Sequence, residues 1–110
     1  MRKGELWLAE LDPTQDKEQT GTRPVVIVSG NAMNDNTELV IICPLTTKIK
    51  NFIGDIILDT GQENGLEQRS EILIFQIRAI SKYRLLKKIG AVTSTESEKI
   101  IENLNKILKY

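Results

Sequence analysis

Apolar side chains in this chain fall into short runs separated by turn residues. Residues 5–11 read as an amphipathic first strand, and residues 25–29 form a continuous, largely β-branched run that is too short for a helix. Further strands are predicted over residues 39–43, 55–58, 71–80 and 88–92, with a helical turn over residues 81–86. Pro44 is expected to end the third strand, and residues 30–36 read as a turn-rich connection.

The last part of the chain carries a helical period. Thr93, followed three residues later by Glu96, has the pattern of a capping box. Apolar residues recur behind it at helical spacing: Ile100, Ile101, Leu104, Ile107 and Leu108. Five or six short strands with one terminal helix predict a mainly β fold, a small and strongly curved antiparallel β-barrel. With 110 residues, we expect one domain over residues 1–110.

Composition removes several kinds of chemistry. Histidine is absent, which excludes the commonest general base and the commonest metal ligand. The single Cys43 lies in an apolar run and is predicted to be a core residue, so no disulfide framework exists and a reducing cytoplasm is expected. No apolar run approaches the length that spans a membrane. We therefore expect a soluble, cytoplasmic protein that holds no metal and no cofactor.

Charge is balanced overall but uneven along the chain. Fifteen basic and fifteen acidic residues give a formal net charge of zero. Residues 69–91 nevertheless carry six basic residues against Glu71 alone. Such a run is commonly a solvated face, and it is also what binding to a phosphate backbone requires. A nucleic-acid partner would have to be held by a local patch of this kind.

One arginine stands at the entrance of the apolar strand that begins at Val25. Pro24 fixes its own φ and pushes Arg23 toward an extended conformation, which constrains where the guanidinium leaves the backbone. A guanidinium meets two phosphate oxygens at once, where lysine offers a point charge. An arginine before a strand is also a common surface ion-pair partner, so Arg23 alone does not decide between the two roles.

Two further polar residues stand beside strand ends: Glu18 in the first long loop and Thr46 just past Pro44. If they meet Arg23, the three groups suit phosphoryl transfer, with a carboxylate as base, an arginine on the phosphate and a hydroxyl on a non-bridging oxygen. Cleavage of RNA by its own 2′-hydroxyl fits best, because the substrate supplies the nucleophile. Each residue by itself is weak support, since loop carboxylates and turn hydroxyls are common.

Taken together, the motifs resemble the MazF/PemK toxins of bacterial toxin-antitoxin systems. The resemblance rests on runs that occur in the family's order and spacing over nearly the whole chain: residues 3–8, Leu11-Asp12-Pro13-Thr14, Glu18-Gln19, Gly21-Thr22-Arg23-Pro24 with residues 25–29, Pro44-Leu45-Thr46-Thr47, and Gln76-Ile77-Arg78. No single run is specific. The ordered set is.

This resemblance implies an SH3-like toxin barrel that forms a two-fold dimer. It also implies a ribosome-independent endoribonuclease that cuts single-stranded mRNA at short sequences without metal, leaves 2′,3′-cyclic phosphate and 5′-hydroxyl ends, and is neutralised by a MazE-like antitoxin. The family's catalytic arginine, threonine and acid fall on Arg23, Thr46 and Glu18. RNA binding is expected from Gln76, Arg78, Thr47, Lys48, Gln19 and Asn31.

Two departures and one alternative accompany the resemblance. The family's Gly-Ser before the Glu-Gln pair is Asp16-Lys17 here, and Phe75 stands where some relatives carry an acid. The alternative function is a non-catalytic toxin similar to the CcdB proteins that trap DNA gyrase. Those toxins act through a Trp-containing tail, whereas this chain ends Ile107-Leu108-Lys109-Tyr110.

Overall fold

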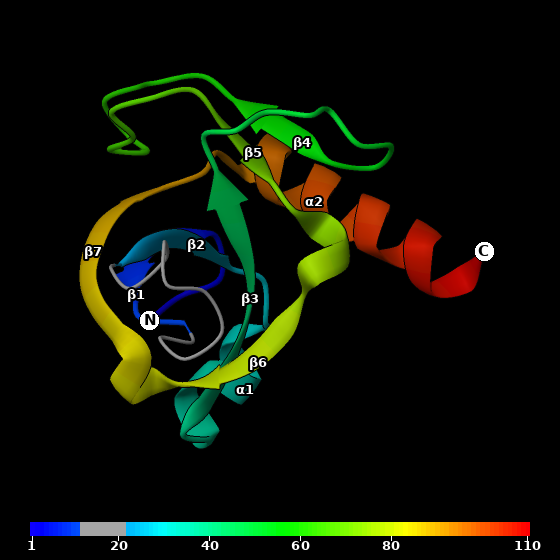
Figure 1. Cartoon of the computed structure of the whole chain (residues 1–110). Coiled ribbons are helices and arrows are strands. Elements are labelled where there is room, and N and C mark those ends of the chain that lie inside the picture. The colour runs from blue at the N-terminus through cyan, green and yellow to red at the C-terminus, as the bar shows by residue number, and fades with distance from the viewer. Residues whose placement is uncertain (12–21) are drawn as a thin grey trace.

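The computed structural model describes residues 1–11 and 22–110 and is dominated by antiparallel strands (Figure 1). In chain order its elements are β1 (Glu5–Ala9), β2 (Arg23–Ile27), α1 (Asn31–Asn36), β3 (Leu39–Thr46), β4 (Ile56–Leu58), β5 (Ser70–Ile72), the 3-10 helix η2 (Ile74–Gln76), β6 (Arg78–Ser81), the 3-10 helix η3 (Lys82–Arg84), β7 (Leu85–Ala91) and α2 (Ser94–Lys109). The predicted mainly β fold with a C-terminal helix is confirmed.

The sheet is organised around β3. Its strand order is β4-β5-β3-β2-β1-β7, and β6 also pairs with β3. One edge of β3 therefore carries β2, while the other carries β6 near its start and β5 near its end. Figure 1 shows β7 and β6 curving around β1 and β2, as expected of a small barrel, while β4 and β5 lie above them in this view.

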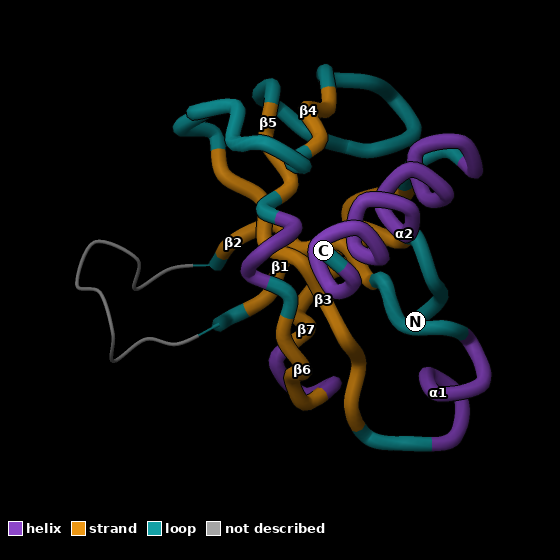
Figure 2. The backbone as a smooth tube through the Cα atoms, turned by 90° about the vertical axis from the view of Figure 1, so that its right-hand side faces the viewer, coloured by secondary structure: helices purple, strands orange, loops and turns teal. Residues whose placement is uncertain are grey.

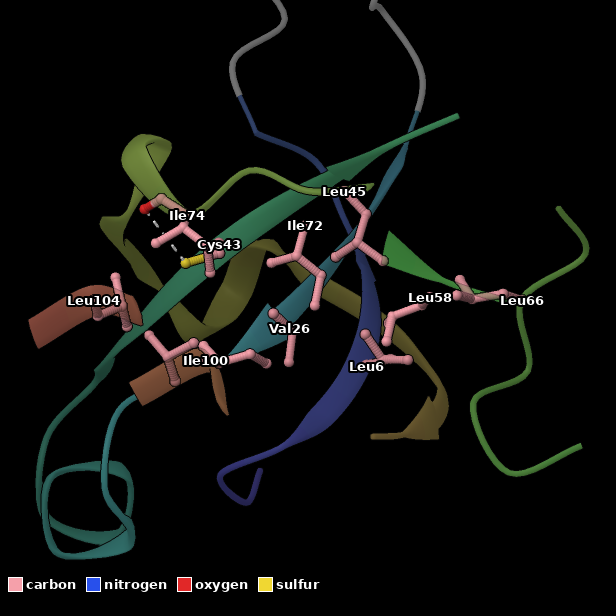
Figure 3. Packing of buried hydrophobic residues seen from close by; sticks show 11 residues of the cluster. Leu6, Val26, Cys43, Leu45, Leu58, Leu66, Ile72, Ile74, Ile100 and Leu104 are labelled. Carbon is pink, nitrogen blue, oxygen red and sulfur yellow. Dashed lines mark hydrogen bonds between the residues drawn. The ribbon is translucent and has the colours of Figure 1, made fainter. Parts of the chain in front are cut away.

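Both faces of the central strands are buried. Alternate residues of a strand point to opposite faces, and in β2 Val26 belongs to one apolar cluster while Val25 and Ile27 belong to another. The first cluster lies between the sheet and α2, where Ile100 and Leu104 pack (Figure 3). Burial on both faces explains why β2 is a continuous apolar run and not an alternating one.

Helix α2 begins as the sequence predicts. The Glu96 N–H donates to Thr93 Oγ1 at 3.1 Å, and the Thr93 N–H donates to Glu96 Oε1 at 2.8 Å, which completes the capping box. Figure 2 shows α2 beside the strands, with α1 at the end of the molecule away from β4 and β5. Among the described helices, none is both long and apolar enough to cross a membrane.

The prediction that Pro44 ends the third strand is wrong, since β3 continues to Thr46. Pro44 lies where β3 changes partner from β6 to β5, so its missing N–H faces a gap in the ladder. Its carbonyl still accepts from the N–H of Leu73 at 2.9 Å. A proline at such a gap does not interrupt the strand.

The predicted strand over residues 71–80 is also wrong, because η2 divides it into β5 and β6. Residues 72, 73 and 74 are all buried in succession, a pattern that a pleated strand with one solvent-facing side does not give. The turn-rich connection predicted over residues 30–36 contains helix α1. That helix is held by buried Asn34, whose Nδ2 donates to the Ser29 carbonyl at 2.9 Å.

Candidate nucleic-acid site

The antiparallel pairing of β2 and β3 brings two predicted site residues to one end of the sheet. The last paired residues at this end of the β2–β3 ladder are Val25 and Pro44. Two residues further along each strand stand Arg23, the first residue of β2, and Thr46, the last residue of β3. Both are partly buried. Their nearness in space follows from strand register, which the sequence alone did not display.

The hydroxyl of Thr46 takes part in a local turn. The Lys48 N–H donates to Thr46 Oγ1 at 3.1 Å. A hydroxyl has one donor and two acceptor positions, so this bond leaves the hydroxyl proton to be donated elsewhere. The turn therefore orients the Thr46 side chain without consuming the hydrogen that a phosphate oxygen would need.

A groove of about 480 Å³ opens beside this end of the sheet. Pro24, next to Arg23, and Thr47, next to Thr46, both line it. The other walls come from β1, β7 and the segment before β5, through Leu8, residues 65–68, Ser70 and residues 87–89. The groove is thus adjacent to both strand-end residues.

Two lysines of β7 line the groove. Lys88 Nζ lies 3.0 Å from Glu5 Oε2. Burial alone would raise the pKa of Glu5, but hydrogen bonds from the Arg2 N–H, from Trp7 Nε1 and from Lys88 outweigh it and lower the pKa to about 2. The pairing neutralises Lys88. Lys87 is exposed on the same groove, and no ion pair is found for it among the described residues.

The remaining basic residues of the 69–91 run are dispersed. Arg69 pairs with Asp59 at 2.9 Å, Lys82 donates to the Asn34 carbonyl, and Arg84 donates to backbone carbonyls at the end of β1. The fold therefore distributes this run over several surfaces and leaves only part of it at the groove.

The other predicted RNA-binding residues lie in different places. Lys48 and Thr47 are exposed just after β3. Gln76 is exposed on η2, and Arg78 is exposed at the start of β6, opposite Ile42 of β3. They do not share one strand face, because Gln76 lies in η2 and only Arg78 lies in a strand. Both nevertheless follow the edge of β3 that is away from β2.

Of the three predicted residues that remain, one lies away from this strand end and two lie outside the described residues. Asn31 begins α1, which follows β2 and therefore lies toward the opposite end of β3 from Thr46. Its Oδ1 accepts from the Lys3 N–H at 2.8 Å. Glu18 and Gln19 lie outside the described residues.

Sequence reasoning missed a buried carboxylate next to Thr46. Glu71 of β5 pairs with Thr46 across the ladder and is fully buried. Its two oxygens accept from three successive backbone N–H groups of residues 50, 51 and 52, at 2.8, 3.0 and 3.0 Å. The signal that could have found it was an acid at the head of the apolar run 72–75.

Cys43 is a core residue, as predicted. It is buried, and its Sγ lies 3.9 Å from the Ile74 carbonyl (Figure 3). Burial, followed by the charge of nearby Asp55, raises the pKa of the thiol to about 12. The thiolate is therefore not populated near neutral pH, and Cys43 is not a nucleophile.

Comparisons with known proteins agree with the motifs. Residues 2–108 match the model of a family described as PemK-like, MazF-like toxin of type II toxin-antitoxin system. The chain is 31% identical to endoribonuclease MazF9 of Mycobacterium tuberculosis, over 94% of this chain and 92% of the relative. It is 34% identical to endoribonuclease MazF of Staphylococcus saprophyticus, over 91% and 84%.

The fold agrees as well. A solved endoribonuclease from a Mycobacterial species, in complex with its cognate antitoxin, superposes with a TM-score of 0.79 at 23% identity and covers 98% of this chain and 94% of that chain. The superposition confirms the predicted fold. The two endoribonuclease relatives confirm the predicted endoribonuclease class. The chain belongs to the PemK-like, MazF-like toxin family of type II toxin-antitoxin systems.

Proposed function

We propose that this endoribonuclease toxin cleaves single-stranded RNA at short sequences by means of the substrate's own 2′-hydroxyl, without a metal ion. The observation that supports this most is the arrival of Arg23 and Thr46 at one end of the sheet beside a groove. A guanidinium and a hydroxyl suffice to hold a phosphodiester and to stabilise the charge that develops on it.

The reaction is a transesterification. The 2′-oxygen attacks phosphorus, the bond from phosphorus to the 5′-oxygen breaks, and the products are a 2′,3′-cyclic phosphate and a 5′-hydroxyl. One proton leaves the 2′-hydroxyl and one reaches the 5′-oxygen. Arg23 binds the non-bridging oxygens as negative charge grows on them, and the Thr46 hydroxyl donates to one of these oxygens.

Glu18 is the proposed base. The chain has no histidine, so a carboxylate is the natural acceptor for the 2′-hydroxyl proton. Glu18 precedes Arg23 by five residues in the connection between β1 and β2. Because β2 begins at Arg23, Glu18 is close to it along the chain.

RNA binding is proposed to extend from this centre in two directions. Thr47 and Lys48 continue the chain beyond the end of β3, while Gln76 and Arg78 lie along the edge of β3 that is away from β2. Exposed amide and guanidinium groups suit the hydrogen-bonding edges of unstacked bases, and lysine suits phosphate. Gln19 and Asn31 remain predictions of the same kind.

We also propose that the protein acts in the cytoplasm, forms a two-fold dimer and is neutralised by an antitoxin. The antitoxin is supported by the structural relative described above, which was solved with its cognate antitoxin. A MazE-like antitoxin would act by covering the RNA groove. The two-fold dimer follows from the family resemblance.

The test is to incubate purified protein with a long transcribed single-stranded RNA and to sequence the new 5′-hydroxyl ends. We expect cuts at one short sequence. Arg23→Ala should lower kcat/KM by about 100-fold or more, in line with the loss of one charge-stabilising donor. The matched control is Arg2→Ala, because Arg2 is a surface arginine paired with Asp35 at 2.8 Å near α1. Equal activity of the two variants would remove Arg23 from the site.

A further inference from the structure

Two carboxyl groups lie behind the strand end that carries Thr46, and the proposed mechanism uses neither. Glu71 is fully buried in β5, and Asp55 lies just before β4. A buried carboxylate is costly unless hydrogen bonds satisfy it. The hydrogen bonds that these two groups make therefore indicate their role in the fold.

Glu71 fixes the loop that follows Thr46. Its carboxylate receives the three successive N–H groups of residues 50–52. Asn51 has a positive φ of 54°, so these N–H groups converge as in an anion-binding backbone nest. Glu71 is also directly opposite Thr46 in the antiparallel pair, a relation that puts the two side chains on the same face about 5 Å apart at Cβ.

Asp55 ties the same loop to η2. Its Oδ1 accepts from the Ile74 N–H at 2.9 Å, and its own N–H donates to the Phe52 carbonyl at 3.0 Å. The rings of Phe52 and Phe75 meet edge to face with centroids 5.5 Å apart. Since η2 ends at Gln76, the two carboxyl groups connect the loop after Thr46 to the element that presents Gln76.

The buried Asp55 Oδ2 lacks a hydrogen-bond partner among the described residues unless it carries a proton. Burial and the neighbouring Glu71 raise the pKa of Asp55 to about 7. Burial alone would raise the pKa of Glu71, but hydrogen bonds from protonated Asp55 and from residues 50–52 outweigh it and lower the pKa to about 2. Below about pH 7 the pair therefore holds one proton, and it resides on Asp55.

Other charged groups around Asp55 do not replace this proton. Cys43, from β3, stays neutral because its pKa is about 12. Lys99 and Lys106, from α2, line a second pocket, separate from the groove beside Thr46, and Asp55 lines it too. Each lysine pairs with Glu102, at 3.6 and 3.4 Å. The nearest group that decides the protonation state of Asp55 is therefore Glu71.

We propose that Glu71 is a positioning residue of the RNA site, which fixes the loop after Thr46, and that protonated Asp55 completes this arrangement by joining the loop to η2. The inference rests on the proposed function, because it concerns how Thr46, Lys48 and Gln76 are presented to RNA. Ionisation of Asp55 puts two negative charges side by side and loosens the loop. The site is then better ordered below neutral pH than above it.

The direction of the pH effect follows from linkage. Asp55 has a raised pKa in the folded protein, so its stabilising contribution is complete below about pH 4 and is lost as pH rises through about 7. Glu71 has a lowered pKa, so its contribution is complete above about pH 4.5 and is lost as pH falls toward 2. We therefore expect the loop to be most stable between the pKa of Glu71, about 2, and that of Asp55, about 7.

The experiment compares the wild type with Asp55→Asn, Glu71→Gln and the matched control Glu98→Gln, which changes an exposed acid on α2. Asparagine mimics protonated Asp55 and cannot ionise. The ratio of kcat/KM of D55N to that of the wild type, with the long transcribed RNA as substrate, should be near one at pH 5 and about tenfold at pH 8, because a group with a pKa of about 7 is then about nine-tenths ionised. E71Q should lose about 10- to 100-fold at every pH, as misplaced groups do, and E98Q should match the wild type.

A second readout needs no RNA. Amide hydrogen exchange of residues 50–52 gives protection factors, which should fall with rising pH in the wild type and stay constant in D55N. If the wild type fails to cleave RNA, the proposed function fails, and the exchange data alone decide whether the loop is held as described. If RNA is cleaved but the D55N ratio and the protection factors are both flat with pH, the inference is overturned. Should E71Q fail to fold, D55N carries the test.

Discussion

Arg23 and Thr46 illustrate how single residues acquire a role from their place on a strand. Pro24 constrains Arg23 toward an extended backbone, and pairing with Ala9 places the arginine at the first position of β2. Thr46 closes β3 and accepts from the Lys48 N–H. Both side chains are therefore oriented by the backbone around them. Preorganised groups of this kind stabilise developing charge better than mobile ones.

The account distinguishes Thr46 from its neighbour. Thr46→Val keeps the shape and removes the hydroxyl, so we expect kcat/KM for RNA cleavage to fall about 100-fold. Thr46→Ser keeps the hydroxyl and should stay within a few-fold of the wild type. Thr47→Val removes the neighbouring hydroxyl, which is also proposed to contact RNA, and should cost less than Thr46→Val. The matched control is Thr60→Val, since Thr60 is an exposed threonine outside the proposed site. A large loss in T47V with little loss in T46V would show that the wrong threonine was assigned.

The sequence named the strand-end residues but not their support. Arg23 and Thr46 stood out because a charge or hydroxyl beside an apolar run is visible in one dimension. In the sequence Glu71 was noted only as the one acid in a basic run. Its role in holding the loop depends on three N–H groups about twenty residues earlier in the chain. Contacts across such distances are set by tertiary structure and leave no local pattern.

At the scale of elements, the segment before Leu66 crosses β7 at very close range. A Cβ on Gly90 would lie 2.4 Å from the Asn64 carbonyl carbon and 2.4 Å from the Glu63 carbonyl oxygen. The Ala91 N–H donates to that Glu63 oxygen at 2.9 Å. This crossing lies next to the groove, which Gly65 and Ile89 line, so the position of that wall depends on a glycine in the strand.

Gly90→Ala should therefore lower the free energy of unfolding by about 1–3 kcal/mol, because backbone atoms must move to admit the methyl group. Urea unfolding followed by circular dichroism gives the value. The matched control is Gly30→Ala, since a Cβ on Gly30 meets nothing within 4 Å, and its effect should be less than about 1 kcal/mol. Equal stability of the two variants would contradict the close crossing.

Elements with a clear local period were the most predictable. The capping box at Thr93 and Glu96 set the start of α2 correctly, and the apolar run from Val25 marked β2. Pro44 misled because its effect depends on the partner strand, which changes from β6 to β5 at that point. Helix α1 was missed because four of its six residues are polar, and the helix is held by the buried Asn34 side chain and not by helical propensity.

At the scale of the whole molecule, one small barrel carries the proposed chemistry at a strand end, next to the loop that binds buried Glu71 and partly buried Asp55. The sheet and α2 enclose the core, while the groove opens on the side formed by β1, β7 and the segment before β5. Loops on a rigid barrel are common places for binding sites. The central claim is that this end of the barrel cleaves RNA through the substrate's 2′-hydroxyl.

The most direct test uses two oligonucleotides that contain the mapped cut sequence, one all-RNA and one with a single 2′-deoxy nucleotide on the 5′ side of the cut, both in the presence of EDTA. Cleavage of the RNA oligonucleotide and no cleavage of its 2′-deoxy counterpart is the predicted result, because only the first carries the nucleophile. Cleavage of the 2′-deoxy oligonucleotide, or a need for added metal with either one, would contradict the account.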